Sequence, residues 1–133
     1  MQCLIDVARR NGAARDPALR QRIAQAAATL DALRCNALRV LAQDEAASGG
    51  VHVSREAYIA KYVWSNWRRD FGRLAADVLG AAACLPDDDP MAQKLRQVWL
   101  FSSSDTIYAG TNEIQLNLIA ERALGMPRRG AIR

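Results

Sequence analysis

The chain has 133 residues, of which 50% are hydrophobic and 24% are charged, and its formal net charge is +4 at pH 7. A chain of this length buries about two-thirds of the surface that its unfolded form exposes, which is enough for one domain with a single core, and this composition excludes a largely disordered or fibrous protein. Because arginines and acidic residues are intermixed, the small positive excess argues against a nucleic-acid-binding protein.

The apolar runs and the cysteines bear on where the protein works. The longest apolar run, residues 74–85, is interrupted by Asp77 and is too short to cross a bilayer, so we expect no membrane association. The start of the chain reaches Asp6 before an apolar stretch of the signal-peptide type develops. The cysteines are odd in number and far apart, which favours buried free thiols: Cys3, Cys35 and Cys84. We therefore expect a cytoplasmic protein.

The first half of the chain predicts two helices. A short helix covers about residues 1–10 and ends at Asn11-Gly12, which tolerate the left-handed backbone of a helix C-terminus. Asp16-Pro17 begins a long helix that runs to about Ala47, with the carboxylate as N-cap and proline at the first helical position. Its apolar residues are three and four apart and form one stripe: Leu19, Ile23, Ala26, Leu30, Leu33, Ala37 and Leu41.

The second half predicts three more helices and no strand. One begins at Ser54 and reaches about Ala83, with a continuous apolar seam: Ala57, Ala60, Trp64, Trp67, Phe71, Leu74 and Val78. Asp89-Pro90 begins the next, which runs to about Thr106, and Thr111 caps a last helix over residues 112–124. Long helices joined by short loops predict an all-α, up-and-down four-helix-type bundle with a short additional terminal helix, in one domain over residues 1–133.

Several polar residues are candidate sites that the pattern does not favour. His52 is the sole histidine, and a zinc or di-iron site requires clustered ligands, so we expect no metal. The acidic run 87–89 is interpreted as a solvated, helix-capping loop and Arg68-Arg69 as solvated surface. The serines at 102–104 lack a strand-to-helix elbow and a paired histidine, and are interpreted as close-packing small residues.

The segment from Thr106 to Gly125 resembles the C-terminal signature of the acyl-CoA dehydrogenase family. That signature has an aromatic residue, a small or acidic residue, Gly-Thr, a polar pair and Ile-Gln, then an apolar helix ending in Ala-x-x-x-Leu-Gly. Here the residues are Tyr108-Ala109-Gly110-Thr111-Asn112-Glu113-Ile114-Gln115, followed by Ala120 and Leu124-Gly125. Asp16-Pro17 and the helix over residues 61–80 resemble upstream family helices in the same order, so the resemblance covers essentially the whole chain.

The resemblance implies a flavin adenine dinucleotide (FAD) site. In the family, residues at the Thr111 and Glu113 positions contact FAD, and the segment around Asp77 and Gly80 contacts its adenine end, often from a neighbouring subunit. Gly110 would let the ligand approach the backbone closely, and Thr111 offers a hydroxyl and backbone N–H groups at a helix N-terminus. The alternative interpretation is that Gly110 and Thr111 only form the turn and cap the helix.

The chemistry that the resemblance implies is α,β-desaturation of an acyl-CoA thioester, in which a carboxylate removes the α-proton while the β-hydride passes to the flavin. Many family members place a glutamate directly after the signature tyrosine, where this chain has Ala109. The catalytic base is therefore unknown. It lies on a preceding helix, or on another subunit of which this chain is a non-catalytic partner, or it is Glu113.

The resemblance also limits what this chain does alone. The helical N-terminal domain and the middle β-domain of the family have no counterpart in 133 residues. We expect a C-terminal domain or fragment that contributes FAD binding and homo- or hetero-oligomer contacts to an acyl-CoA dehydrogenase and is inactive by itself. The alternative is a non-catalytic helical partner subunit or a protein-interaction module. The acyl substrate depends on residues outside this segment.

Overall fold

The computed structural model describes residues 1–46, 54–85 and 88–128. These residues form helices without strands, so the all-α prediction is confirmed. The α-helices are α1 (Gln2–Asn11), α2 (Pro17–Ala46), α3 (Arg55–Leu79), α4 (Pro90–Ser102) and α5 (Asn112–Leu118). The 3-10 segments are η1 (Ala13–Arg15), η2 (Gly80–Ala83) and η3 (Ser103–Thr106), and a π-helical segment, η4 (Ile119–Ala123), continues α5.

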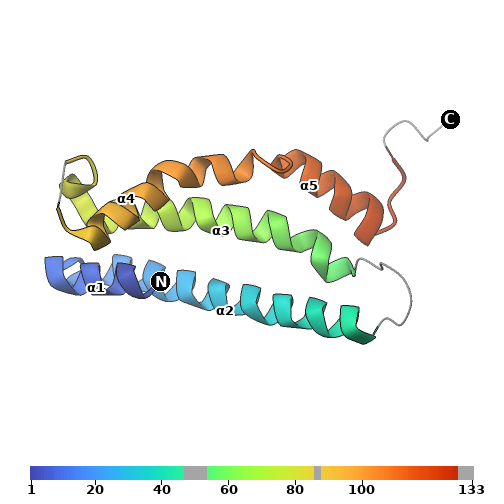
Figure 1. The fold of residues 1–133 in the computed structure, drawn as a ribbon, viewed down its shortest axis with the longest axis horizontal. Coiled ribbons are helices and arrows are strands. Elements are labelled where there is room, and N and C mark those ends of the chain that lie inside the picture. The colour runs from blue at the N-terminus through green and yellow to red at the C-terminus, as the bar shows by residue number, and fades with distance from the viewer. Residues whose placement is uncertain (47–53, 86–87, 129–133) are drawn as a thin grey trace.

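Helix α3 is the centre of the molecule. It contacts α1, α2, α4 and α5. Figure 1 shows α2 running antiparallel to α3 on one side, whereas α4, η3 and α5 follow one another along the other side. The short helix α1 contacts η1, α3 and α4. This is the up-and-down arrangement that the loop lengths predicted.

The hydrophobic core lies at the end of the molecule where α1, α3 and α4 meet. Its buried residues are Leu4, Val7 and Ala8 of α1, Phe71, Leu74, Ala75, Val78 and Leu79 of α3, Ala83 of η2, and Ala92 and Leu95 of α4. Trp67 stacks on Phe71 with ring centroids 5.1 Å apart, and its indole N–H donates to the carbonyl of Ala26 at 2.9 Å. The predicted packing role of these aromatic side chains is therefore confirmed.

The helix starts follow the predicted caps. At the starts of α2, α3, α4 and α5 a side-chain oxygen accepts from a backbone N–H that the helix leaves unpaired. The pairs are Asp16 with Ala18 at 2.8 Å, Ser54 with Ala57 at 3.3 Å, Asp89 with Met91 at 2.9 Å and Thr111 with Ile114 at 3.4 Å. The helical path ends close to the predicted residues, Ala83, Thr106 and Leu124, but its last turns are 3-10 in η2 and η3 and π-helical in η4.

The predicted apolar stripe of α2 is covered over only part of its length. Leu19 to Leu33 are half-buried against α3, but Ala37 and Leu41 are exposed, and no residue between 17 and 42 is fully buried. The reason is that the substantial contacts of α2 are with α3 and η1 alone. For the same reason Cys35 of α2 is exposed, and Cys84 is exposed as well, so the prediction of buried thiols is wrong for both.

The described residues were also expected to contain neither a membrane-spanning helix nor a metal site. Across the described ranges, no helix is long and apolar enough to span a membrane. Within the same ranges, no group of three or more histidine, cysteine, aspartate or glutamate side chains is placed to hold a metal ion. His52 and Asp87 lie outside the described residues, whereas Asp89 acts as the helix cap that the sequence predicted.

Candidate functional site

The signature segment forms a sharp, solvent-facing turn between η3 and α5. Ala109 and Gly110 have φ values of 53° and 99°, two left-handed residues in succession. Alanine adopts this conformation at a cost of about 1 kcal/mol, so the turn is held by its surroundings. Glycine is required at the next position, because a Cβ on Gly110 would lie 2.6 Å from the side-chain nitrogen of Gln115. We therefore call residues 108–111 the signature turn.

Thr111 and Glu113 form a small hydrogen-bonded unit at the start of α5. The Thr111 hydroxyl oxygen accepts from the backbone N–H of Ile114 at 3.4 Å. A hydrogen bond from the same hydroxyl lowers the pKa of Glu113, and the backbone N–H of Glu113 itself lowers it further. Glu113 is exposed and Thr111 is half-buried, so both predicted cofactor residues face the surface next to Gly110.

Gln115 supports the turn from below. Its side chain is only 9% exposed, and its amide nitrogen donates to the carbonyl of Ala109 at 3.2 Å. The backbone N–H of Gln115 donates to the carbonyl of Thr111 at 2.9 Å. The glutamine of the signature therefore has a structural role here, because its side chain and its backbone both hydrogen-bond to the turn that precedes it.

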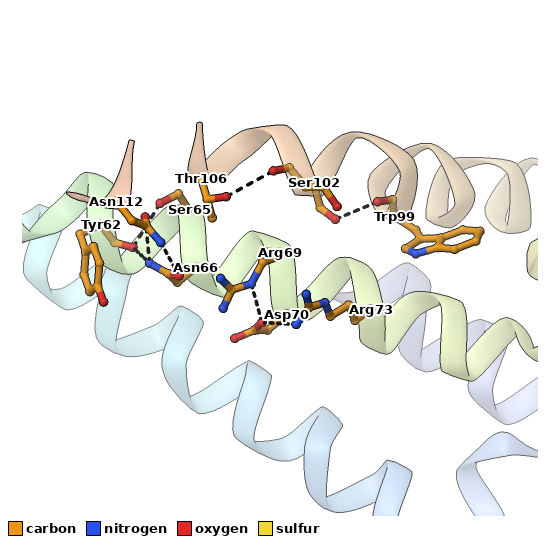
Figure 2. A network of polar contacts seen from close by, with 11 residues as sticks. Tyr62, Ser65, Asn66, Arg69, Asp70, Arg73, Trp99, Ser102, Thr106 and Asn112 are labelled. Atoms are coloured by element: carbon orange, nitrogen blue, oxygen red, sulfur yellow. Dashed lines mark hydrogen bonds and ion pairs between the residues drawn. The ribbon is translucent and has the colours of Figure 1, made fainter. Parts of the chain in front are cut away.

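Asn112 ties the start of α5 to α3. Its side-chain amide nitrogen donates to the side-chain oxygen of Asn66 at 3.0 Å, and Asn66 donates back to Asn112 at 3.3 Å and to the carbonyl of Tyr62 at 2.7 Å. Figure 2 shows these amides facing each other between the two helices. The pair fixes the direction in which α5 leaves the turn.

A buried carboxylate, Asp105, lies directly under the turn. It is fully buried and accepts from Nε of Arg68 at 3.0 Å and from the hydroxyl of Tyr108 at 2.9 Å. The ammonium of Lys61 donates to the backbone carbonyl of Asp105 at 2.6 Å and lies 5.3 Å from the centre of the Tyr108 ring. The interpretation of Arg68 as solvated surface is wrong, because it pairs with this carboxylate and also lies 5.6 Å from the Trp64 ring.

The surface around the turn is apolar as well as polar. Large hydrophobic side chains here have exposed fractions between 43% and 64%: Phe101, Ile107, Tyr108, Ile114 and Leu116. Phe101 and Tyr108 lie with ring centroids 6.1 Å apart. A ligand that combines a flat apolar face with polar edges would therefore find both kinds of partner at the signature turn.

The other two predicted cofactor residues lie elsewhere. Asp77 is about three helical turns, roughly 16 Å, further along α3 than Asn66, and its carboxylate pairs with Arg22 of α2 at 2.7 Å. Gly80 ends α3 with φ 58° and is exposed. The fold thus brings Gly110, Thr111 and Glu113 together and places Asp77 and Gly80 at the other end of α3.

A groove runs between α2 and α3 near Asp77. Its volume is about 760 Å³, and its walls include Arg22, Asn66, Trp67 and Asp70. Asp70 lies 3.0 Å from Nε of Arg69 and 3.9 Å from a guanidinium nitrogen of Arg73, as Figure 2 shows. Opposite charges therefore already compensate each other on the α3 side of this groove.

Neither the signature turn nor Glu113, which follows it in α5, offers a favourable base. Ala109 has no titratable group, and the Tyr108 hydroxyl is held by Asp105, whose hydrogen bond raises the pKa of Tyr108. Glu113 is exposed and has a lowered pKa, which makes it a weaker proton acceptor than an ordinary glutamate. The geometry therefore suits binding better than proton transfer.

The residues that sequence reasoning missed all come from α3 and η3. Asp105, Lys61, Arg68 and Asn66 hold the turn in place, but no local motif includes them. The one sequence signal was the combination of charged and amide residues on a helix that otherwise carries an apolar seam. Their role could be assigned only from the fold, in which α3 lies beneath the turn and its side chains bond to the segments on either side of it.

Comparison with known proteins identifies the family. The family described as acyl-CoA dehydrogenase, C-terminal domain, matches residues 2–124. Acyl-CoA dehydrogenase IpdE1 of Mycolicibacterium smegmatis is 39% identical over 125 residues, which cover 94% of this chain and 30% of that protein. IpdE1 of Mycobacterium tuberculosis is 40% identical over 126 residues, which cover 94% of this chain and 31% of that protein.

A solved structure shows the same fold. The Tcur3481-Tcur3483 steroid ACAD (acyl-CoA dehydrogenase) superimposes with a TM-score of 0.75 and 26% sequence identity, over 95% of this chain and 33% of that one. The chain thus spans about a third of the length of the relatives it matches. With the family match over nearly the whole chain and the shared fold, the chain belongs to the acyl-CoA dehydrogenase C-terminal domain family.

Proposed function

We propose that this chain is the C-terminal helical domain of a FAD-dependent acyl-CoA dehydrogenase, and that it contributes the signature turn to the flavin site and surfaces to the oligomer. The observation that carries the proposal is the family match over residues 2–124 together with the exposed position of the turn that bears Thr111. The chain is proposed to act as one domain and to be inactive alone, because the rest of the enzyme lies outside it.

The residues of the turn fit a flavin. Gly110 and Ala109 present no bulky side chain, Thr111 is half-buried, and the side chains of Ile107 and Ile114 in the same segment are exposed. FAD, when bound, would supply the hydride acceptor. Thr111 would contribute a hydroxyl to a polar edge of the ligand, and Glu113 an acceptor beside it. The apolar neighbours would exclude water from the contact.

Asp77 and Gly80 are proposed to contact a second FAD molecule, not the one whose flavin ring lies at the signature turn of the same chain. They lie at the far end of α3, and we propose that they contact the adenine end of a cofactor whose flavin end lies at the signature turn of another subunit. This arrangement requires an oligomer. The compared steroid ACAD, whose name joins two proteins, supports a heteromeric assembly for this chain.

The catalytic base is proposed to lie outside the signature turn. Ala109 cannot accept a proton, and Glu113 has a lowered pKa and a hydrogen bond to Thr111. The base is then supplied by a helix that precedes this domain or by a partner subunit. A partner subunit agrees better with a chain that carries the flavin-contact residues while lacking the usual glutamate.

The proposed substrate is an acyl-CoA thioester with a bulky, steroid-derived acyl group. The support is the fold and 26% identity shared with a steroid ACAD over 95% of this chain. The reaction would be α,β-desaturation of that thioester, with the CoA portion and most of the acyl pocket bound by the rest of the enzyme.

The direct test is purification of the tagged chain together with the proteins that bind it in its source cells. We expect a yellow complex that desaturates a steroid-derived acyl-CoA, measured by flavin absorbance and by reduction of an electron-accepting dye. A well-folded complex without flavin would contradict the proposal and would favour the alternative, a plain protein-interaction module. A yellow complex that acts only on short straight-chain thioesters would overturn the substrate class alone.

A further inference from the structure

Beneath the signature turn, a buried carboxylate connects two segments that are distant in sequence. We propose that Asp105 is the positioning residue of the signature turn: it holds Tyr108 against α3 and so fixes Ala109 to Thr111 in the ligand-binding conformation before any ligand is present. The inference rests on the proposed function for what the turn binds, but the positioning itself is a property of this chain.

Asp105 is built into the structure as a bridge. Its side chain is fully buried, and a buried carboxylate is stable only when it is paired and hydrogen-bonded. One oxygen accepts from Nε of Arg68 at 3.0 Å, and the other accepts from the hydroxyl of Tyr108 at 2.9 Å. Each oxygen thus serves a different segment, one on α3 and one in the turn.

The backbone of Asp105 is held from the same side. Lys61 donates to its carbonyl oxygen at 2.6 Å, and the same ammonium group lies 5.3 Å from the centre of the Tyr108 ring. Lys61 and Arg68 lie about two turns apart on α3, so two side chains of this helix hydrogen-bond to Asp105, one to its backbone and one to its carboxylate. These bonds fix the position of the carboxylate that accepts from Tyr108.

The position of Tyr108 decides where the turn lies. The hydroxyl of Tyr108 is bonded to the buried Asp105, and the two residues that follow have left-handed φ values, 53° at Ala109 and 99° at Gly110. The left-handed alanine is intrinsically unfavourable, so the chain needs an anchor on each side of it. Tyr108 is the anchor before it, and the Gln115 amide on the Ala109 carbonyl is the anchor after it.

An asparagine at this position would keep the shape of Asp105 but not its charge. Its amide oxygen could accept from the guanidinium of Arg68 and its amide nitrogen could donate to the hydroxyl oxygen of Tyr108, but Arg68 would lose the negative charge that compensates it. Loss of one partner of a buried charge also destabilises the fold as a whole. Tyr108→Phe is the cleaner change, because it removes only the bond between the turn and the carboxylate and leaves Arg68 paired with Asp105.

Hydrogen exchange in the full chain without flavin tests the positioning. The probes are backbone N–H groups bonded within the segment: Tyr108 to the Ser104 carbonyl, Ile114 to the Thr111 hydroxyl and Gln115 to the Thr111 carbonyl. We expect Tyr108→Phe and Asp105→Asn to speed exchange at these amides about fivefold or more, with Tyr108→Phe leaving the core amides of α1 and α3 unchanged. Asp70→Asn, an exposed carboxylate that pairs with arginines on the same helix, should leave both sets unchanged.

A second readout follows the tyrosine itself. Tyr108 is faced by Asp105 from η3 and by Lys61 and Arg68 from α3. The hydrogen bond to Asp105 raises the pKa of Tyr108. Asp105→Asn should therefore lower that pKa in an ultraviolet titration, with Tyr108→Phe identifying the signal, whereas a purely space-filling Asp105 would leave it unchanged.

The results separate the positioning from the proposed function. If Tyr108→Phe leaves the turn amides as protected as in the original chain, or if they change only together with the core amides, the positioning is wrong whatever the flavin does. If the turn loosens in Tyr108→Phe but the assembled enzyme retains its flavin when Thr111 is replaced by valine, the positioning holds and the cofactor role of the turn fails.

Discussion

Thr111 is the residue on which most of the site depends. Its hydroxyl oxygen caps α5 through the backbone N–H of Ile114. The same hydroxyl also lowers the pKa of Glu113 by hydrogen bonding. A single side chain thus shapes the start of the helix and favours the ionised carboxylate beside the turn.

Replacing Thr111 by valine should raise the pKa of Glu113 toward its ordinary value, 4.5, because the hydrogen bond from the hydroxyl is the main reason that it is lowered. The sign follows from the charge: the donor favours the ionised carboxylate, so its loss favours the protonated form. Carbon-detected NMR titration of the Glu113 carboxyl carbon measures the effect. Thr111→Ser, which keeps the hydroxyl, should keep the low pKa, and a valine variant with an unchanged pKa would show that no such bond forms in solution.

Part of the site was predictable from sequence and part was not. Gly110, Thr111 and Glu113 lie in one short motif, so their placement in an exposed turn at a helix start followed from local rules. Asp105 could not be found in this way, because its partner Arg68 lies 37 residues earlier and the pair forms only when η3 packs on α3. A buried ion pair between distant segments leaves no local pattern.

At the scale of the helices, the contact between α3 and α4 depends on small residues. Gly72 is buried in α3 directly opposite Ser102 of α4, which is 1% exposed. A Cβ at Gly72 would lie 2.1 Å from the hydroxyl oxygen and 2.7 Å from the Cβ of Ser102, and 3.2 Å from the Cα of Trp99. The prediction that the serines at 102–104 are close-packing residues is confirmed for Ser102 but is wrong for Ser103, which is exposed. At Ser102 the two helices approach each other closely.

Gly72→Ala should destabilise the chain by about 1–3 kcal/mol, since the added methyl group overpacks a closed contact. The opposing gain is smaller, about 1 kcal/mol, from the better helix propensity of alanine. Urea unfolding followed by circular dichroism gives the free energy of unfolding. The double variant with Ser102→Gly should recover part of the loss, and a Gly72→Ala variant as stable as the original would contradict the close approach of α3 and α4.

The helices also show where sequence patterns stop being informative. The caps at Asp16, Ser54, Asp89 and Thr111 were predictable because each is a local hydrogen bond. The stripe of α2 predicted only that one face is apolar. It did not predict that α3 covers this face as far as Leu33 and leaves Leu41 59% exposed, since that depends on how long the neighbouring helices are and where they lie.

Over the whole molecule, the core and the site lie apart. The buried residues gather where α1, α3 and α4 meet, whereas the signature turn lies along α3 toward its N-terminal half and is held by polar anchors. The apolar side chains around the turn remain exposed, with Ile107 64% and Ile114 52% accessible. The core thus lies at one end of the domain, and the other end exposes apolar side chains that further protein or a ligand can cover. This agrees with a chain that spans about a third of the length of its relatives.

Thr111 in the signature turn is proposed to contact the flavin of the assembled enzyme, and the affinity of the purified complex for flavin is the most direct measure of that contact. With Thr111→Val we expect the flavin dissociation constant to rise about fivefold, the effect of one neutral hydrogen bond. Thr111→Ser should retain the original value, as should Thr29→Val, which removes a hydroxyl bonded within α2. An unchanged flavin dissociation constant in Thr111→Val, in a complex that is otherwise intact, would contradict the account.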